Sequence, residues 1–248
     1  MFCAVLLAVV GLPVSCLIRQ APEPYGYLPD GVARTPPEPG KADTMVSAAD
    51  AGFPAREVLR IPSFWLLASG HSAALMSVSA LSAHLIPFLI QDISMSLEAA
   101  ATVVATITAC TFTAQLLGGF LGDRLSKRAV AATCMVGHTL GLLVLMVATT
   151  PATVYVAAIL HGVSWGVRGP LMMPLRAEYF GRRALATIEG FVALVTTAGL
   201  TIGPLMVGVV ADNLGDYRIA FGVLAVGTAG GGLCFAFAAP PKARSAIA

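Results

Sequence analysis

Apolar residues gather into seven long blocks, and polar connections separate these blocks. The blocks cover residues 2–18, 63–90, 99–121, 129–148, 153–175, 187–210 and 219–239. Most of them hold the roughly 20 apolar residues that a helix needs to cross the hydrocarbon core of a bilayer. Because apolar and polar residues do not alternate within a block, the pattern favours helices over the strands of a membrane barrel. It therefore predicts an all-α, polytopic membrane protein with about seven transmembrane helices, and a lipid bilayer as its surroundings.

The composition narrows the class of protein further. Charged residues make up 11% of the 248 residues, whereas a soluble domain has roughly 25%. The net charge of +2 does not point to a nucleic-acid partner. The five cysteines lie in apolar blocks without a C-x-x-C pair, so we expect neither a disulfide framework nor a metal site. Motifs such as G-x-S-x-G, H-E-x-x-H and the P-loop are absent, so we expect no enzyme and no cofactor.

Basic residues lie on every second connection. The connections 19–60, 122–128 and 176–186 and the C-terminal tail hold 13 of the 15 Lys and Arg residues. The alternate connections hold only Arg218, and Arg168 lies inside an apolar block. Because Lys and Arg in short loops stay on the cytoplasmic side, we predict a cell (inner) membrane protein with its N-terminus outside and its C-terminus in the cytoplasm.

The connections also predict how the chain is organised. Residues 1–18 form one helix, 19–60 a cytoplasmic linker with seven prolines, 61–239 a six-helix bundle and 240–248 a cytoplasmic tail. Residues 55–60 are compatible with a short interfacial helix. The other loops are short, so neighbouring helices are expected to pack as antiparallel hairpins. A signal peptide is the alternative for residues 1–18, but a basic n-region and a small-x-small cleavage site are both lacking.

The loop at residues 119–128, Gly-Phe-Leu-Gly-Asp-Arg-Leu-Ser-Lys-Arg, is the most informative motif. Gly119 and Gly122 permit close approach of helices, and Asp123 can cap or pair with a neighbouring helix end. The basic residues hold the turn at the cytoplasmic surface; they are Arg124, Lys127 and Arg128. The loop resembles the G-x-L-x-D-R-x-G-R-R signature of the major facilitator superfamily, with Ser126 in place of the usual glycine.

Further stretches resemble the same superfamily. Residues 179–183 with Gly190 are similar to its loop between helices ten and eleven, and Gly203-Pro204 is similar to its helix eleven. The linker is similar to the central loop of bacterial monocarboxylate and oxalate–formate transporters. The resemblance implies that the seven segments are helices six to twelve of a twelve-helix transporter. The chain would then be the C-terminal half, preceded by the last helix of the N-terminal half. The first five helices of that N-terminal half would be missing. The resemblance also implies that the solute binds between two halves and that Asp123 docks against the absent half.

The fifth block carries Arg168, a charge about 12 Å inside the cytoplasmic end of its helix. His161, Trp165 and Arg168 follow helical spacing and share a face, while Gly162, Gly166 and Gly169 share another that suits helix packing. The resemblance implies that this helix lines the solute cavity. Two interpretations remain open: Arg168 binds an anionic group of the solute, or it bonds to backbone carbonyls near the inner gate.

Other polar residues in the apolar blocks are weaker candidates. His71 and His84 lie about 220° apart on their helix and so belong to different sites; either could relay a coupling proton or form a hydrogen bond in packing. Gln115 follows Thr108 and Thr111 at helical spacing, as a cavity wall or a packing surface. Glu189 suits a helix N-terminus, where Arg182 or Arg183 can pair with it. His138 has no assigned role.

The function predicted from these features is secondary active transport of a small organic solute, with an anion as one option, by alternating access. The second hypothesis is a truncated, non-transporting membrane protein or a scaffold that pairs with a missing N-terminal half or a second chain. A membrane sensor is a third, although the loops are too short to hold a signalling domain.

Overall fold

The computed structural model describes residues 5, 7–17 and 52–241. The chain divides into two units, Met1–Ala48 and Ala49–Ala248, and each is described by itself. In the first unit, a π-helical turn, η1 (Leu7–Gly11), runs into a six-residue helix, α2 (Leu12–Leu17). The ends of the predicted first segment lie outside the described residues, so a membrane crossing there stays a prediction, as does the helical domain at residues 1–18.

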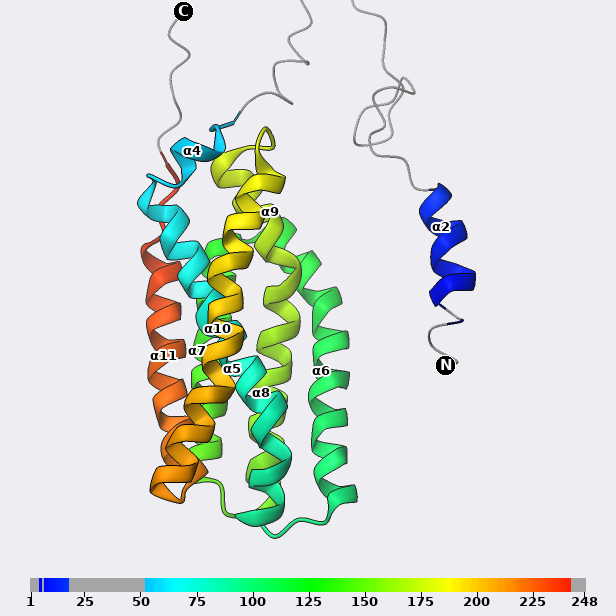
Figure 1. Ribbon diagram of the computed structural model, residues 1–248, viewed down its shortest axis with the longest axis vertical. Helices are drawn as coiled ribbons and strands as arrows, with labels where there is room; N and C mark the ends of the chain where they lie inside the picture. The colour runs from blue at the N-terminus through cyan, green and yellow to red at the C-terminus, as the bar shows by residue number, and fades with distance from the viewer. Residues whose placement is uncertain (1–4, 6, 18–51, 242–248) are drawn as a thin grey trace, which may run out of the picture. The chain divides into compact units, whose positions relative to one another are not determined.

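The second unit is a bundle of long helices (Figure 1). Its elements are α4 (Ala55–Val58), α5 (Pro62–Gln91), α6 (Leu97–Arg124), α7 (Lys127–Val147), α8 (Pro151–Arg168), η3 (Gly169–Leu171), α9 (Met172–Phe180), α10 (Leu185–Leu214) and α11 (Tyr217–Phe237). Among the described residues, α5, α6, α7, α10 and α11 are long and apolar enough to cross a membrane. This part of the chain holds no strand beyond an isolated bridge. The prediction of an all-α, polytopic membrane fold is confirmed.

The remaining long helix, α8, carries the buried charge and continues almost directly into α9. Between them lies η3, a single 3₁₀ turn that contains Pro170. Proline has no amide hydrogen to donate, so the regular α-helical bonding is interrupted there. The result is one helical path that spans the fifth predicted segment and extends beyond it on both sides.

Side-chain caps explain where several helices begin. The hydroxyl of Ser96 accepts a hydrogen bond from the Ala99 amide at 3.2 Å, and Thr150 forms a capping box at the start of α8. Ser126 caps α7 in the same way, accepting from Ala129 at 3.4 Å. Because a capping hydroxyl satisfies an otherwise free helical amide, the departure from glycine at position 126 has a structural role.

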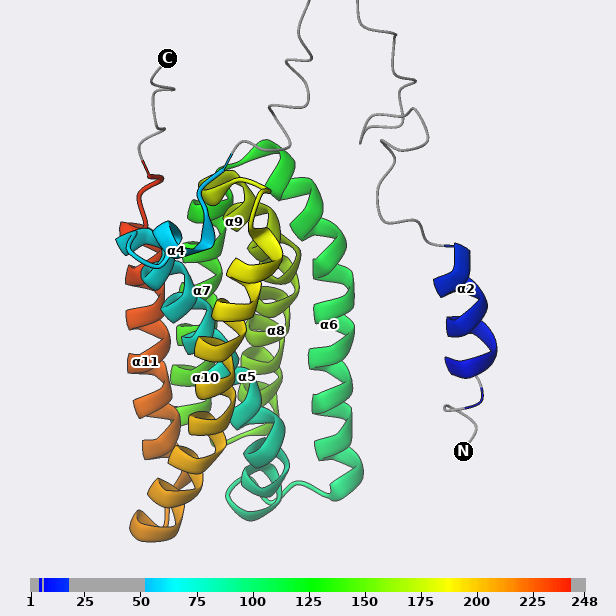
Figure 2. The ribbon, with the colours of Figure 1, turned by 45° about the horizontal axis from the view of Figure 1, so that its top comes forward.

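The packing order of the helices differs from the prediction. Helix α6 packs most extensively against α8, α5 against α10, and α7 against α11, while α7 and α8 also pair as a hairpin. Figures 1 and 2 show α6 beside α8, and α7 beside α11, in both views. The expectation that all sequence neighbours pack as hairpins is wrong, because α5 barely touches α6 and α6 barely touches α7.

Glycines that allow close backbone approach explain this order. On α8, a side chain added at Gly162 or Gly166 would collide with the backbone of Ile107 or Thr111 on α6. Close approach of this kind gives membrane helices their packing contacts, because the hydrophobic effect does not drive helices together inside a bilayer. Helix α10 makes the same approach to α5 through Gly199 and Gly203. Gly169, which the sequence placed in the same stripe, lies in open space.

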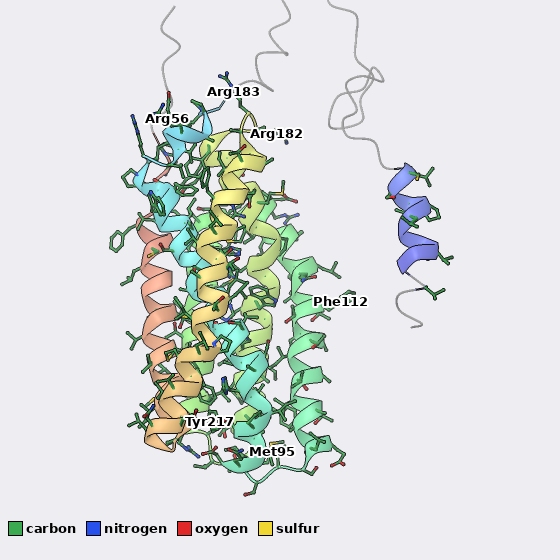
Figure 3. The ribbon with its side chains drawn as sticks, viewed as in Figure 1. Arg56, Met95, Phe112, Arg182, Arg183 and Tyr217 are labelled. Carbon is green, nitrogen blue, oxygen red and sulfur yellow. The ribbon has the colours of Figure 1, made fainter. Side chains whose placement is uncertain are left out.

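The two ends of the bundle differ in charge, as Figure 3 shows. Arg56, Arg182 and Arg183 lie at one end, here called the basic end, and Met95 and Tyr217 lie at the other. At the basic end the last part of the linker joins the bundle: the Phe53 amide donates to the Phe180 carbonyl at 2.9 Å. The short helix α4 covers residues 55–58 of the expected 55–60, and its position at a membrane interface stays a prediction. Most of the linker and most of the tail lie outside the described residues.

Candidate functional site

A cavity of about 380 Å³ opens where α5 and α6 stand apart, and α8 lines it between them. Apolar side chains form most of its wall, among them Leu81 and Leu85 of α5 and Val104 and Ile107 of α6. Polar groups enter from three helices; they are Ser82, Thr108, Thr111, His161 and Trp165. The cavity can therefore hold a molecule with an apolar body and at least one polar group.

Arg168 lies one helical turn beyond Trp165 on the same face of α8, and it is completely buried. Its guanidinium carbon lies 5.1 Å from the centre of the Trp165 ring, and its Nη1 lies 3.3 Å from Nδ1 of His71 on α5. Among the described residues, Nε and Nη2 of Arg168 have no hydrogen-bonding partner. The predicted face of His161, Trp165 and Arg168 thus exists; His161 and Trp165 line the cavity, and buried Arg168 contacts Trp165.

The charge of Arg168 has no counterion in the described part of the chain. All described carboxylates lie at or near helix ends, away from membrane depth; they belong to Glu57, Asp92, Glu98, Asp123, Glu178, Glu189, Asp212 and Asp216. An arginine at the centre of a membrane helix costs roughly 2.5–3.5 kcal/mol on insertion scales. An anionic group beside Arg168 could accept hydrogen bonds from its two free donors, Nε and Nη2, and neutralise its charge.

His138 is the residue that the sequence interpretation missed. Its Nδ1 lies 3.1 Å from Nδ1 of His161, both rings are buried, and the two rings meet edge to face. One Nδ1 must carry the hydrogen and the other must accept it, so the two neutral rings hold different tautomers. The spacing contained the signal: positions 138 and 161 lie almost equally far from the turn at residues 148–150, so an α7–α8 hairpin places them at one depth.

The remaining candidate residues in the apolar segments do not lie at one site. His71 points to Arg168, whereas Nε2 of His84 lies 3.0 Å from the carbonyl oxygen of Pro204 on α10. The two histidines therefore serve different sites, as their angular separation indicated. Gln115 is exposed on α6 and is not part of the cavity wall, although Thr108 and Thr111 are.

The turn between α6 and α7 differs from expectation in one glycine. An added side chain at Gly122 would collide with Leu171, so this glycine does permit close approach, but Gly119 lies in open space. Gly118 has the close contact instead, with the Val167 carbonyl of α8. Asp123 is exposed and shows no hydrogen bond or ion pair among the described residues.

Each basic side chain of the turn contacts a different group. Arg124 lies over the ring of Phe120, with 4.1 Å between the guanidinium carbon and the ring centre. Lys127 forms an ion pair with Glu178 of α9. Arg128 donates from Nη1 to the carbonyl of Ala238 at 3.1 Å, which ties the start of α7 to the end of α11.

Glu189 pairs with a different arginine from the two expected. Its two carboxylate oxygens accept hydrogen bonds from Nε and Nη2 of Arg176 at 2.5 and 2.6 Å, so the pair is bidentate. Arg182 and Arg183 are exposed in the loop before α10. The prediction failed because Glu189 lies beyond the first turn of α10, where its side chain reaches back to α9.

The six long helices, their loop motif and the cavity beside α8 define a polytopic membrane bundle. Residues 67–248 match the model of the Major Facilitator Superfamily, and the chain belongs to that superfamily. A triacylglyceride transporter of Mycobacteroides abscessus is 24% identical over 147 residues, which cover 56% of this chain and 28% of that protein.

Two solved structures show the same fold. The Escherichia coli fucose:proton symporter FucP is 19% identical with a TM-score of 0.66, covering 75% of this chain and 45% of FucP. A mutant of the peptide transporter POT in complex with sulfate is 17% identical with a TM-score of 0.64, covering 74% of this chain and 41% of that one. The chain thus spans less than half the length of each of these relatives. The specific resemblance to monocarboxylate and oxalate–formate transporters stays a prediction.

Proposed function

We propose that this chain forms one six-helix half of a secondary transporter, and that the cavity beside α8 belongs to the path of a small organic solute. Membership of the superfamily and the position of the cavity support this function. Transporters of this type bind their solute between two halves that rock about it, so transport requires a second half, in one polypeptide or in a partner chain. The basic end is then the cytoplasmic one, with the linker and the tail on that side.

The solute that fits these groups best is an organic anion with an apolar body. The observation that carries this choice is Arg168, completely buried, without a carboxylate partner and with two free donors beside Trp165. The apolar wall contributed by α5 and α6 suits the remainder of such a molecule. If a proton is the coupling ion, the titratable candidates are His71, which contacts Arg168, and His161, which lines the cavity.

Trp165 offers a direct test of binding. The chain has two tryptophans, and Trp65 lies near the basic end, half exposed, so a Trp65→Phe variant leaves Trp165 as the only tryptophan fluorophore. We expect medium-chain carboxylates to change the fluorescence of this variant saturably. Arg168→Gln should weaken the binding at least tenfold, which corresponds to about 1.4 kcal/mol. Arg168→Lys should restore part of it, because a point charge replaces the guanidinium fork.

The matched control is Arg218→Gln, which removes a cation in the first turn of α11, next to Tyr217 at the end of the bundle opposite the basic end. It should leave carboxylate binding unchanged. Equal affinity of the Arg168→Gln variant and its parent, or equal affinity for a carboxylate and its neutral amide, would contradict the anion assignment.

An uncharged lipid is a second candidate solute, favoured by the mainly apolar wall of the cavity and by the relative named as a triacylglyceride transporter. A short-chain triacylglycerol should then displace the carboxylate and bind the Arg168→Gln variant as tightly as the parent. Uptake into vesicles decides between a transporter and a non-transporting scaffold. Uptake that required no second half, measured on a monomeric chain, would contradict the two-half mechanism.

A further inference from the structure

A second hollow lies between α7 and α11, away from the helices that line the solute cavity. It measures about 470 Å³, and small residues create it, with Ala132 on α7 and Ala229, Gly232 and Ala236 on α11. Large apolar side chains border it and are themselves exposed, as Leu233 is at 58%. Both helices are long and apolar enough to cross a membrane, so a groove between them that is bordered by exposed apolar side chains would face lipid in a bilayer.

A cation lies just beyond one end of the groove, where Arg128 lines a neighbouring hollow together with Glu178 and Tyr179. Arg128 lies four residues before Ala132, about 6 Å along α7 and on the same face. Its Nη1 donates to the Ala238 carbonyl at 3.1 Å, and the Tyr179 hydroxyl donates to the same oxygen at 2.7 Å. These bonds hold the guanidinium beside the end of α11, where it also contacts the Tyr179 side chain. A guanidinium carries five N–H donors, more than these two contacts use.

The charge of Arg128 is not neutralised by the described carboxylates nearby. Glu178, on the adjoining helix α9, is taken by Lys127. Asp123 lies in the same turn but makes no ion pair with Arg128. Burial raises the pKa of the Tyr179 phenol, which therefore stays a neutral donor. The groove thus has an apolar channel at membrane depth and an available positive charge at its head.

We propose that this groove binds an anionic phospholipid, with one acyl chain along α7 and α11 and the phosphate at Arg128. The dimensions agree: the groove runs from Ala132 to Leu140, about 12 Å of helix, within the roughly 15 Å of one leaflet. The lipid comes from the leaflet at the basic end, where the positive residues of the bundle gather. This proposal does not depend on the identity of the solute.

Native mass spectrometry of the detergent-solubilised chain tests the proposal, with phosphatidylglycerol and phosphatidylcholine of equal chain length as probes. We expect phosphatidylglycerol to bind about fivefold more tightly, since one basic residue near a lipid surface contributes on the order of 1 kcal/mol. Arg128→Gln should abolish this preference, whereas Arg124→Gln, an exposed arginine in the same turn, should retain it. Equal binding of the two lipids to the parent chain, or an unchanged preference in Arg128→Gln, would overturn the assignment.

A second pair of variants tests the acyl chain and separates lost binding from lost folding. Ala229→Leu fills the groove without touching the charge and should weaken binding of both lipids severalfold. Ala198→Leu adds the same side chain at an exposed position of α10 and should leave binding unchanged. Both variants should elute as monodisperse species. Unaltered lipid binding in Ala229→Leu, or competition by soluble glycerol phosphate alone, would show that the groove is not the lipid site.

Discussion

Two adjacent glycines of α6 provide a sharp test of why the helices pair as they do. A methyl group added at Gly118 would collide with the carbonyl oxygen of Val167 on α8 and would lie 3.0 Å from the ring of Pro170. The same methyl group at Gly119 would meet nothing within 4 Å. Gly118→Ala and Gly119→Ala therefore each add one methyl group to α6, and only the methyl group at position 118 enters the α6–α8 interface.

The two substitutions should change the free energy of unfolding in opposite directions. Alanine is preferred to glycine in a helix by about 1 kcal/mol, and Gly119→Ala should gain part of this. At Gly118 the blocking atom belongs to a backbone and cannot rotate away, so the helices must separate. Overpacking of this kind typically costs about 1–3 kcal/mol. After the gain in propensity is subtracted, Gly118→Ala should lower the free energy of unfolding by up to about 2 kcal/mol.

Reversible unfolding in mixed micelles with increasing SDS measures the difference directly. Gly118→Ala should unfold at a lower SDS fraction than the parent chain, and Gly119→Ala at the same or a higher fraction. The reasoning fails if the two variants shift in the same direction by similar amounts, because the glycine contact would then contribute nothing to the pairing of α6 with α8.

The helices themselves could be predicted from the sequence because their causes are local. Continuous apolar blocks, helix caps and basic loops depend on residues close together in the chain, and the observed helices extend the predicted blocks by only a few residues at most ends. Ser126 is an instructive case, since its departure from the family motif is explained by a hydrogen bond to a residue three positions later.

Helix pairing and the buried contacts required the folded structure. Loop length suggested hairpins, but backbone contacts at glycines such as Gly166 pair α8 with α6 instead. The partner of Glu189 depended on the course of α9, which residue spacing does not determine. His138 looked isolated because its partner, His161, lies on another helix. The face of Arg168 was predictable from period 3.6 alone, whereas its contact with His71 was not.

Three further substitutions test the electrostatics at the two ends of the bundle. Glu189→Gln removes the bidentate partner of buried Arg176 and should lower the free energy of unfolding by about 1.5–3 kcal/mol, whereas Glu178→Gln, which breaks an exposed pair, should cost less than about 1 kcal/mol. Equal losses in SDS unfolding would contradict this reasoning. At the opposite end, burial and then the charge of Asp216 raise the pKa of Asp92 above its unfolded value. The stabilising contribution of protonated Asp92 is therefore complete in acid and is lost as the pH rises through the raised pKa. Asp92→Asn keeps a neutral side chain at every pH, so its stability relative to the parent chain should increase between pH 3 and pH 7. A difference that stays constant with pH, or one that decreases, would show that the folded protein does not disfavour the ionised carboxylate.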